Sequence, residues 1–249
     1  VNNLEFDGIK FSNTTPAVGT ALPFSCNVNM NGTTSNISFL NCSFTGSNTL
    51  GSTNHAFFFE TGSLQTGAWV FNNCQFVNTS RGINLNASQT SSITSLTVTG
   101  CTFNTLDRGL TATNGTTAAV AGSSATITNN TFAAPAAALG YNSINLGGIA
   151  TVTITGNTQN NYAGIIASVA STATVSNNSV TGGTYAQGIS VTGLSTAPVT
   201  ATVSNNTLSA NSTISVTNSI SPVINQNTCG SISVSGNTGI SITNNNITT

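Results

Sequence analysis

Apolar and polar residues alternate in short segments along the whole chain, and each segment ends at an Asn or Gly step. The repeating unit is apolar, any, apolar, any, Asn or Gly, Asn or Cys, any, apolar, as in "LTVTGCTF" from Leu96 and "ATVSNNTL" from Ala201. Alternation with a period of two residues is typical of β-strands. Ten such segments follow one another at intervals of 18 to 33 residues, and they begin at Leu4, Ile37, Trp69, Leu96, Ala125, Val152, Ala173, Ala201, Pro222 and Ile240.

A second motif, Gly-apolar-any-apolar, follows most of these segments, as in "RGINL" at 81–85 and "QGISV" at 187–191. Strands this short, repeated with a constant buried face, fit the rungs of a coil in which each turn lies on the previous one. Asn and Gly tolerate the left-handed backbone region and therefore supply the bend. The second Asn of each step can pair with its equivalent one rung away. The predicted ladder is Asn130, Asn157, Asn178, Asn206, Asn227 and Asn245.

The ten units resemble those of right-handed parallel β-helices, the pectin-lyase-like and NosD-like repeat proteins. The resemblance covers essentially the whole chain and implies an all-β fold, a single right-handed parallel β-helix (solenoid) of about ten rungs over residues 1–249. The intervals shorten toward the C-terminus and all twelve Phe lie at or before Phe132, so we expect the helix to taper in that direction. The longest intervals predict lateral loops near 12–35 and 45–54.

Charged residues make up only 3% of the chain, and none occurs from Gly109 to Thr249. The formal net charge of −1 argues against electrostatic binding of nucleic acid or of anionic lipid. No apolar run reaches 18 residues, so we expect no membrane insertion. An uncharged surface does little to keep molecules apart, which favours a protein that assembles or one that is coated with glycan.

Three cysteines occupy the bend position that Asn takes in later rungs, and they should form a stack: Cys42, Cys74 and Cys101. The simplest interpretation is that small buried residues replace Asn there. A disulfide between neighbours stays open, because the rung spacing falls within the allowed Cα separation. The five cysteines show no CxxC spacing, so the sequence predicts no zinc site and no other metal or cofactor.

Few ionisable side chains are available for chemistry. Aligning the second motif places His55, Arg81 and Arg108 in one column, and Glu60 and Asp107 lie on the same turns. Glu60 and Asp107 are the candidate carboxylates, with Arg108, for a polysaccharide hydrolase or lyase. The simpler interpretation is that Arg108 neutralises Asp107 and that Glu60 is a solvated surface charge. Lyases of the family that this chain resembles carry clustered Asp on one face, which this sequence lacks, so we do not expect an enzyme.

One outward position of the repeat is Thr on five consecutive rungs: Thr97, Thr126, Thr153, Thr174 and Thr202. A regular Thr array on a flat solenoid face can bind ice. Thr also suits any exposed strand, which is the simpler explanation.

Both ends of the predicted coil lack an amphipathic capping helix, so we expect unpaired strand edges there. Two bare ends of one coil are complementary, and a head-to-tail contact between copies does not close on itself. A second explanation is that the chain is a fragment whose caps lie outside this sequence. The predicted assembly interface comprises Leu4, Phe6, Ile9 and Phe11 on the first rung and Ile240, Ile242 and Ile247 on the last.

These patterns favour an extracellular or cell-surface structural protein that self-assembles head to tail into a filament or surface layer, with a further copy of itself as partner. The first alternative is a carbohydrate-binding adhesin or phage-fibre-type module that contacts glycans. Its candidate ligand-binding residues are His55, Phe57, Trp69, Arg81 and Arg108. The second alternative is the polysaccharide hydrolase or lyase described above.

Overall fold

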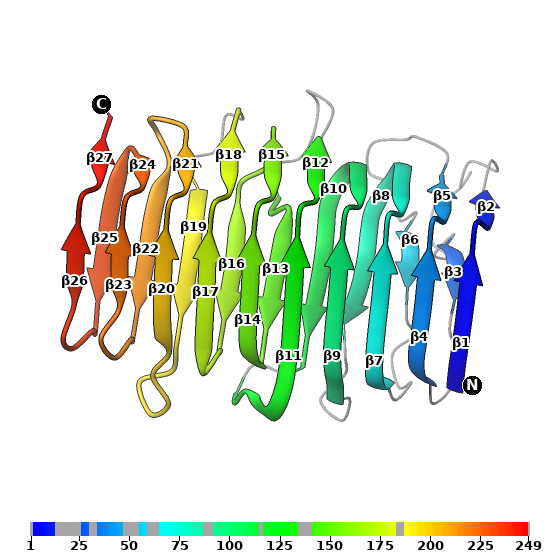
Figure 1. Cartoon of the computed structure of the whole chain (residues 1–249), viewed down its shortest axis with the longest axis horizontal. Helices are drawn as coiled ribbons and strands as arrows, with labels where there is room; N and C mark the ends of the chain where they lie inside the picture. The colour runs from blue at the N-terminus through cyan, green and yellow to red at the C-terminus, as the bar shows by residue number, and fades with distance from the viewer. Residues whose placement is uncertain are drawn as a thin grey trace, which may run out of the picture.

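The chain folds into a parallel β-helix, and its strands stack into a rod with the N-terminus and C-terminus at opposite ends (Figure 1). The structure is a computed structural model, and it describes residues 2–12, 26–29, 34–46, 55–58, 65–86, 92–114, 117–133, 141–182 and 187–248. Every element in those ranges is a strand. They contain no helix with the length and apolar character needed to cross a membrane. The predicted all-β solenoid is therefore confirmed.

The first sheet has ten parallel strands, one from each predicted unit, which confirms the count of ten rungs. Within the repeating units the register is constant from the pair Leu4–Ile37 to the pair Ala173–Ala201, and the register shifts in β4, β7 and β11 lie ahead of the units. The strands are β1 (Asn2–Asp7), β4 (Thr34–Leu40), β7 (Gln65–Asn72), β9 (Ser92–Thr99), β11 (Val120–Thr128), β14 (Ile149–Thr155), β17 (Thr172–Ser176), β20 (Thr200–Ser204), β23 (Val223–Asn225) and β26 (Ser241–Thr243).

The second sheet follows the bend of each rung. Two long strands, β8 (Gln75–Asn86) and β10 (Thr102–Thr113), begin in this sheet and continue into the third. The other strands are β2 (Lys10–Ser12), β5 (Ser43–Thr45), β12 (Thr131–Ala133), β15 (Thr158–Asn160), β18 (Ser179–Thr181), β21 (Thr207–Leu208), β24 (Thr228–Cys229) and β27 (Asn246–Ile247).

The third sheet is built largely from the Gly-apolar-any-apolar motif. It contains the second halves of β8 and β10 together with β3 (Cys26–Asn29), β6 (His55–Phe58), β13 (Ile144–Gly147), β16 (Ile165–Ser168), β19 (Gln187–Thr192), β22 (Thr213–Thr217) and β25 (Ser231–Ser235). Strand β3 lies inside the range 12–35, which we predicted to be a loop. That prediction is wrong for residues 26–29, because the first rung also needs a strand in the third sheet. Residues 47–54 of the second predicted loop lie outside the described residues.

Asn and Gly give the bend between the first and second sheets on nine of the ten rungs, as the sequence predicts, and Gln226 takes the same position on the remaining rung with a φ of 56°. The first residue of each step has a positive φ, for example 56° at Asn177 and 67° at Gly156. The second residue points inward and forms the ladder. Asn157 illustrates it: its Nδ2 donates to Asn178 Oδ1 at 3.0 Å and to the Ile127 carbonyl of the preceding rung at 2.9 Å. All six predicted ladder residues are linked in this way, from Asn130 to Asn245.

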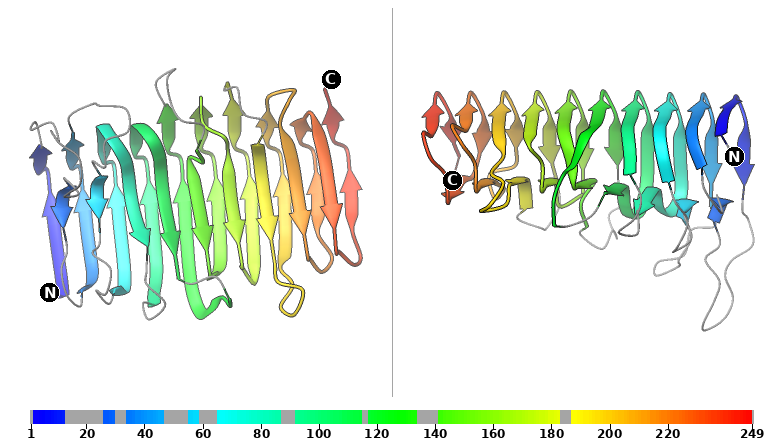
Figure 2. Two further views of the ribbon diagram at one scale, coloured as in Figure 1. Left: turned by 180° about the vertical axis from the view of Figure 1, so that it is seen from behind. Right: turned by 90° about the horizontal axis from the view of Figure 1, so that it is seen from below.

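The interior of the rod is apolar, and its filling changes along the axis. Phe rings stack in register in the N-terminal half, with centroids 4.5 to 5.0 Å apart along the column Phe11, Phe44, Phe76, Phe103 and Phe132. Val180 and Leu208 continue this column after Gln159. First-sheet strands lengthen from six residues in β1 to nine in β11 and then shorten to three in β26, so the strand lengths agree with the predicted taper in the C-terminal half of the rod. Figure 2 shows the rungs from two further sides.

Candidate functional site

The two end rungs expose the interior columns of the helix. Leu4 and Ile9 are 37% and 42% exposed, whereas Ile37, one rung further in, is fully buried. Phe6 and Phe11 are half-buried against the core. At the other end, Ile240, Ile242 and Ile247 are exposed. All seven predicted interface residues therefore belong to the two outermost rungs of the described chain.

The end rungs match each other in register, because the columns run through the whole rod. The register places Phe6 and Ile242 in one interior column and Phe11 and Ile247 in another. Leu4 and Ile240 lie in a third interior column. A fourth column runs along the bend and places Ile9 opposite Asn245. Three of the four columns therefore present an apolar side chain at both ends.

The ionisable column lies at the start of the third sheet. His55 pairs with Arg81, and Arg81 pairs with Arg108, so the predicted alignment of the three residues is confirmed in the backbone register. The side chains of His55 and Phe57 lie outside the described part of the structure, and so does Glu60. The predicted carboxylate pair of Glu60 and Asp107 therefore stays a prediction.

Asp107 is held mainly by Arg81, not by the adjacent Arg108. Arg81 Nε donates to Asp107 Oδ2 at 2.8 Å, whereas Arg108 Nε lies 3.8 Å from Oδ1. The carboxylate is buried, with 8% of Asp107 exposed. The arrangement differs from the simple expectation because Arg81 reaches across from the neighbouring rung, while Arg108 turns toward another element. Asp107 therefore acts first as the counter-charge of Arg81.

Two tyrosines lie next to the cluster of Arg81, Asp107 and Arg108, and the repeat pattern did not predict either of them. Tyr162 lies beneath it, where its hydroxyl donates to the Thr105 carbonyl at 2.9 Å and contacts the Thr105 hydroxyl. Burial raises the pKa of Tyr162 to about 12, so it stays a neutral donor. Tyr141 lies at the surface, and Arg108 Cζ sits 5.1 Å above the centroid of its ring. Neither residue belongs to the repeating unit, and the sequence gives no signal for their positions.

Trp69 is fully buried, so the prediction that it contacts a ligand is wrong. The residue stands at an inward position of β7, in register with Ile37 and Leu96. An aromatic residue in the repeating unit fills the core of a wide rung and is not available to a glycan.

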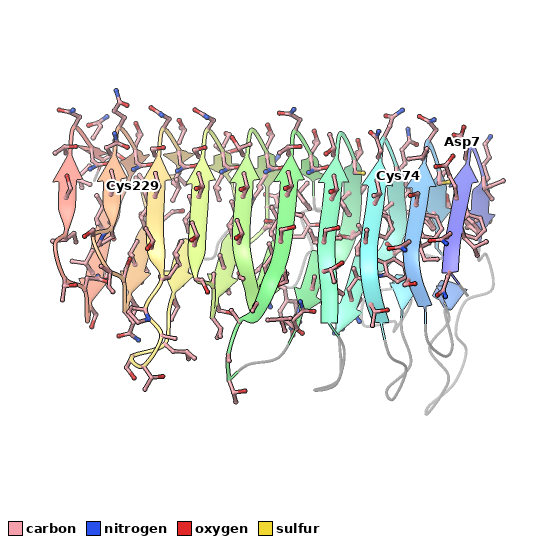
Figure 3. The ribbon with its side chains drawn as sticks, turned by 60° about the horizontal axis from the view of Figure 1, so that its bottom comes forward. Asp7, Cys74 and Cys229 are labelled. Atoms are coloured by element: carbon pink, nitrogen blue, oxygen red, sulfur yellow. The ribbon has the colours of Figure 1, made fainter. Side chains whose placement is uncertain are left out.

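The predicted thiol stack forms at the bend, where each thiol replaces an Asn side chain. Cys74 Sγ donates to the Phe39 carbonyl of the preceding rung at 3.3 Å, and the Cys74 backbone N–H donates to Cys101 Sγ at 3.3 Å. Cys42, Cys74 and Cys101 are free thiols, as is Cys229, which lies further toward the C-terminal end (Figure 3). Within the described ranges, His, Cys, Asp and Glu nowhere form a group of three that could hold a metal ion.

Burial raises the pKa of the Cys42 thiol. The hydrogen bond shared with Cys74, together with burial, raises the pKa of Cys101. Both thiols are therefore protonated at neutral pH and act as weak hydrogen-bond donors inside the wall of the helix.

The five predicted Thr residues form one outward column of the first sheet, in register from Thr97 to Thr202. Positions two residues further on carry Thr99, Thr128 and Thr155, and the hydroxyls of Thr99 and Thr128 lie 3.0 Å apart. The face is regular and uncharged over these rungs.

Comparison of the chain with family models, with curated proteins and with solved structures finds no match. The resemblance to pectin-lyase-like and NosD-like proteins therefore stays a prediction, and the fold stands on the structure alone.

Proposed function

We propose that the protein is a structural subunit that stacks head to tail with further copies of itself into a filament or a layer of filaments. The observation that carries this proposal is the match between the two end rungs. In-register stacking would place Ile240 over Leu4, Ile242 over Phe6 and Ile247 over Phe11, and it would bury side chains that are exposed or half-buried in one copy. Burial of apolar surface is the main favourable term in such an association.

The backbone supports the same contact. Strands β26 and β1 are the two outer strands of the first sheet, and each pairs with one neighbour in the described chain. Unpaired strand edges are templates for further pairing, and parallel stacking would continue both the first and the second sheet. The third sheet ends one rung earlier, at β25, so the proposed contact rests on two sheets.

Charge does not oppose the contact. Glu5, Asp7 and Lys10 lie on the first rung, and Figure 3 shows Asp7 at that end of the rod. The last rung has no charged residue, so no like charges meet. At the bend, Asn245 faces Ile9, and the Asn ladder stops there because Ile9 offers no side-chain oxygen. This one mismatched column makes the proposed contact weaker than an internal rung-to-rung contact.

Electron microscopy of the purified chain over a concentration series tests the proposal. We expect filaments with an axial repeat of about 50 Å, which is ten rungs at roughly 4.8 Å each. Ile242→Lys places a charge inside the contact and should give short rods. Ser241→Lys is the matched control, because it adds the same charge one residue away on the outward face and should leave filaments intact.

A mixing experiment tests the polarity of the contact. Leu4→Lys blocks the N-terminal rung and Ile242→Lys blocks the C-terminal rung. Each variant alone should stay a single rod, and the mixture should give dimers in which the two unblocked ends meet. The proposal is wrong if the wild-type protein stays monomeric at every concentration, or if the Ile242→Lys protein still forms filaments. The extracellular or cell-surface location stays a prediction from composition.

A further inference from the structure

We propose that the outward face of the first sheet binds the surface of ice over five middle rungs, those of β9, β11, β14, β17 and β20. The single Thr column of the sequence is the centre of three parallel columns, because each of these strands has three outward positions in register. All fifteen side chains at these positions carry a hydroxyl, and we call them the hydroxyl array. They are Ser95, Thr97, Thr99, Ser124, Thr126, Thr128, Thr151, Thr153, Thr155, Thr172, Thr174, Ser176, Thr200, Thr202 and Ser204.

The hydroxyl array is regularly spaced in two directions. Neighbouring parallel strands lie about 4.8 Å apart, and alternate residues along one strand lie roughly 6.6 Å apart. The array therefore covers about 19 Å along the rod and about 13 Å across it. Figure 3 shows these strands side by side in the middle of the rod, with side-chain oxygens in rows on the side facing the viewer.

The hydroxyls of the array are available to water. None of the fifteen side chains is buried. Among the described residues, the ten hydroxyls at the first two outward positions of each strand have no side-chain hydrogen bond. At the third position, Thr99 pairs with Thr128 at 3.0 Å. Most residues of the array are Thr, whose branched side chain has few rotamers, so hydroxyl and methyl groups repeat in fixed orientations.

An array of this kind orders water into a two-dimensional layer. A hydroxyl on a rigid strand holds its bound water at a fixed place, and the next rung repeats that place. Oxygen atoms on the prism faces of hexagonal ice repeat at spacings close to both spacings of the array. The ordered layer therefore fits a layer of the crystal, and the protein adsorbs to ice and slows its growth. Liquid water has no such layer, which makes the binding selective for the crystal.

The preference of Thr for exposed strands does not account for the array. The third sheet is part of the same rod, and its outward positions on two of the same rungs are Asn145 and Ile166. In the first sheet itself, Val70 and Val223 stand in the central column just beyond the two ends of the array. The five strands hold no charged and no aromatic residue, so the face offers neither ion pairs to a mineral nor stacking surfaces to a polysaccharide.

Microscopy of a single ice crystal in a solution of the full chain tests the proposal. We expect a gap between the melting and the freezing temperature and a crystal that becomes faceted on its prism faces. The Ile242→Lys variant should show the same gap, because its change lies on the last rung, outside the array. The ice-binding proposal is therefore separable from filament formation. A wild-type chain with neither gap nor facets, or a gap that the Ile242→Lys variant loses, would overturn it.

Substitutions on opposite faces of one rung locate the binding surface. Thr174→Lys should abolish the gap, because a long charged side chain holds the ice layer away from the array. Thr192→Lys is the matched control, since it makes the same change at an outward position of the third sheet on the same rung and should leave the gap intact. Thr126→Lys repeats the test at an exposed position of another rung.

Circular dichroism identifies the variants that keep the fold, and the comparison uses those. Equal gaps for the array variants and for Thr192→Lys would show that another surface binds ice, and the proposal would be wrong. If the array variants change only the lateral association of rods, the face is a contact between copies, and the proposal is wrong as well.

Discussion

At the scale of single residues, Asn and Cys perform the same structural task at the bend. Asn157 Nδ2 donates to the Ile127 carbonyl of the preceding rung and to the Thr155 carbonyl two residues earlier. Cys74 Sγ donates to the equivalent carbonyls of Phe39 and Asn72. The difference is on the acceptor side, because an amide oxygen accepts strongly and a thiol sulfur accepts weakly. The Asn rungs are therefore tied together more tightly than the Cys rungs.

Replacing one ladder residue tests this interpretation. Asn178→Ala leaves the Asn157 backbone N–H without its side-chain acceptor, removes one of the three acceptors of Asn157 Nδ2, and removes the Asn178 side-chain donor from the Ile154 carbonyl. Because each buried group that loses its partner costs about 1 to 3 kcal/mol, we expect a loss of roughly 3 kcal/mol or more in the free energy of unfolding. Urea denaturation measures it.

The neighbouring residue provides the control for that substitution. Asn177 has a φ of 56° and is exposed. Asn177→Gly keeps the left-handed conformation accessible, so its effect should stay within about 0.5 kcal/mol. Equal losses from Asn178→Ala and Asn177→Gly would show that the bend, and not the ladder, supplies the stability.

The buried thiols predict a dependence of stability on pH. The pKa values of Cys42, Cys101 and Cys229 are raised above the usual value of 9.0 in the folded protein, whereas the hydrogen bond with Cys101 lowers the pKa of Cys74. As the pH rises through that value, the unfolded chain releases three protons that the folded chain keeps, and Cys74 alone acts in the opposite sense, so the net stability falls as pH rises. Each thiol contributes a slope of up to about 1.4 kcal/mol per pH unit.

Urea denaturation under reducing conditions between pH 8 and 9.5 measures this slope, in a range where tyrosines of ordinary pKa, about 10, are still mostly protonated. A Cys101→Ala variant should start less stable because it leaves a cavity, and its stability should fall less steeply with pH. A wild-type stability that stays flat or rises over this range would contradict the assignment of raised pKa values.

At the scale of elements, the turn from the second to the third sheet depends on glycine because the next rung occupies the space of a side chain. A Cβ added at Gly82 would lie 2.5 Å from a ring carbon of Phe103, and one added at Gly109 would lie 2.4 Å from a ring carbon of Phe132. Gly82 and Gly109 therefore accommodate the aromatic column. The Gly of the Gly-apolar-any-apolar motif therefore leaves the space that the Phe ring of the next rung occupies.

Gly109→Ala tests this coupling. The substitution should destabilise the protein by about 1 to 3 kcal/mol or more, because the methyl group overlaps the Phe132 ring and would also lie 2.6 Å from the Ser143 backbone carbonyl oxygen. Phe132→Leu should recover part of that loss in the double variant, which a double-mutant cycle measures. Gly147→Ala is the control, since its nearest neighbours are side-chain atoms at 3.2 Å and the effect should be small. An additive cycle would mean that Phe132 is not the obstacle.

The sequence predicts the elements that belong to the repeat and fails where the repeat is interrupted. Alternation and the Asn or Gly step located all ten first-sheet strands, the Asn ladder and the Arg81–Arg108 column, because each depends only on local spacing. Strand β3 was missed, because it lies within a long interval without the full motif. Tyr141 and Tyr162 were missed because they reach the arginine cluster from rungs that are distant in sequence.

At the scale of the whole molecule, the rod is a stack of interchangeable units joined by a constant register. The segment "TATVSNN" occurs at residues 172–178 and again at 200–206, and the two copies pair residue by residue from Thr172 with Thr200 to Ser176 with Ser204. In a protein of this kind, stability is close to a sum of rung terms and nearest-neighbour terms. Removal of one complete rung should therefore leave a shorter rod of the same architecture.

Deleting residues 173–200 joins Thr172 to Ala201 and preserves the "TATVSNN" segment at the junction. Asn206 would then continue the ladder from Asn157, and Ile214 would follow Ile165 in the third sheet, because both already share those columns. We expect a folded rod with unchanged circular dichroism, shortened by about 4.8 Å in small-angle scattering. Deleting only 173–186 joins Thr172 to Gln187, forces third-sheet residues into the first sheet, and should abolish cooperative unfolding. If both deletions unfold the chain, the rungs are not independent units, and stacking whole copies end to end would lose its physical basis as well.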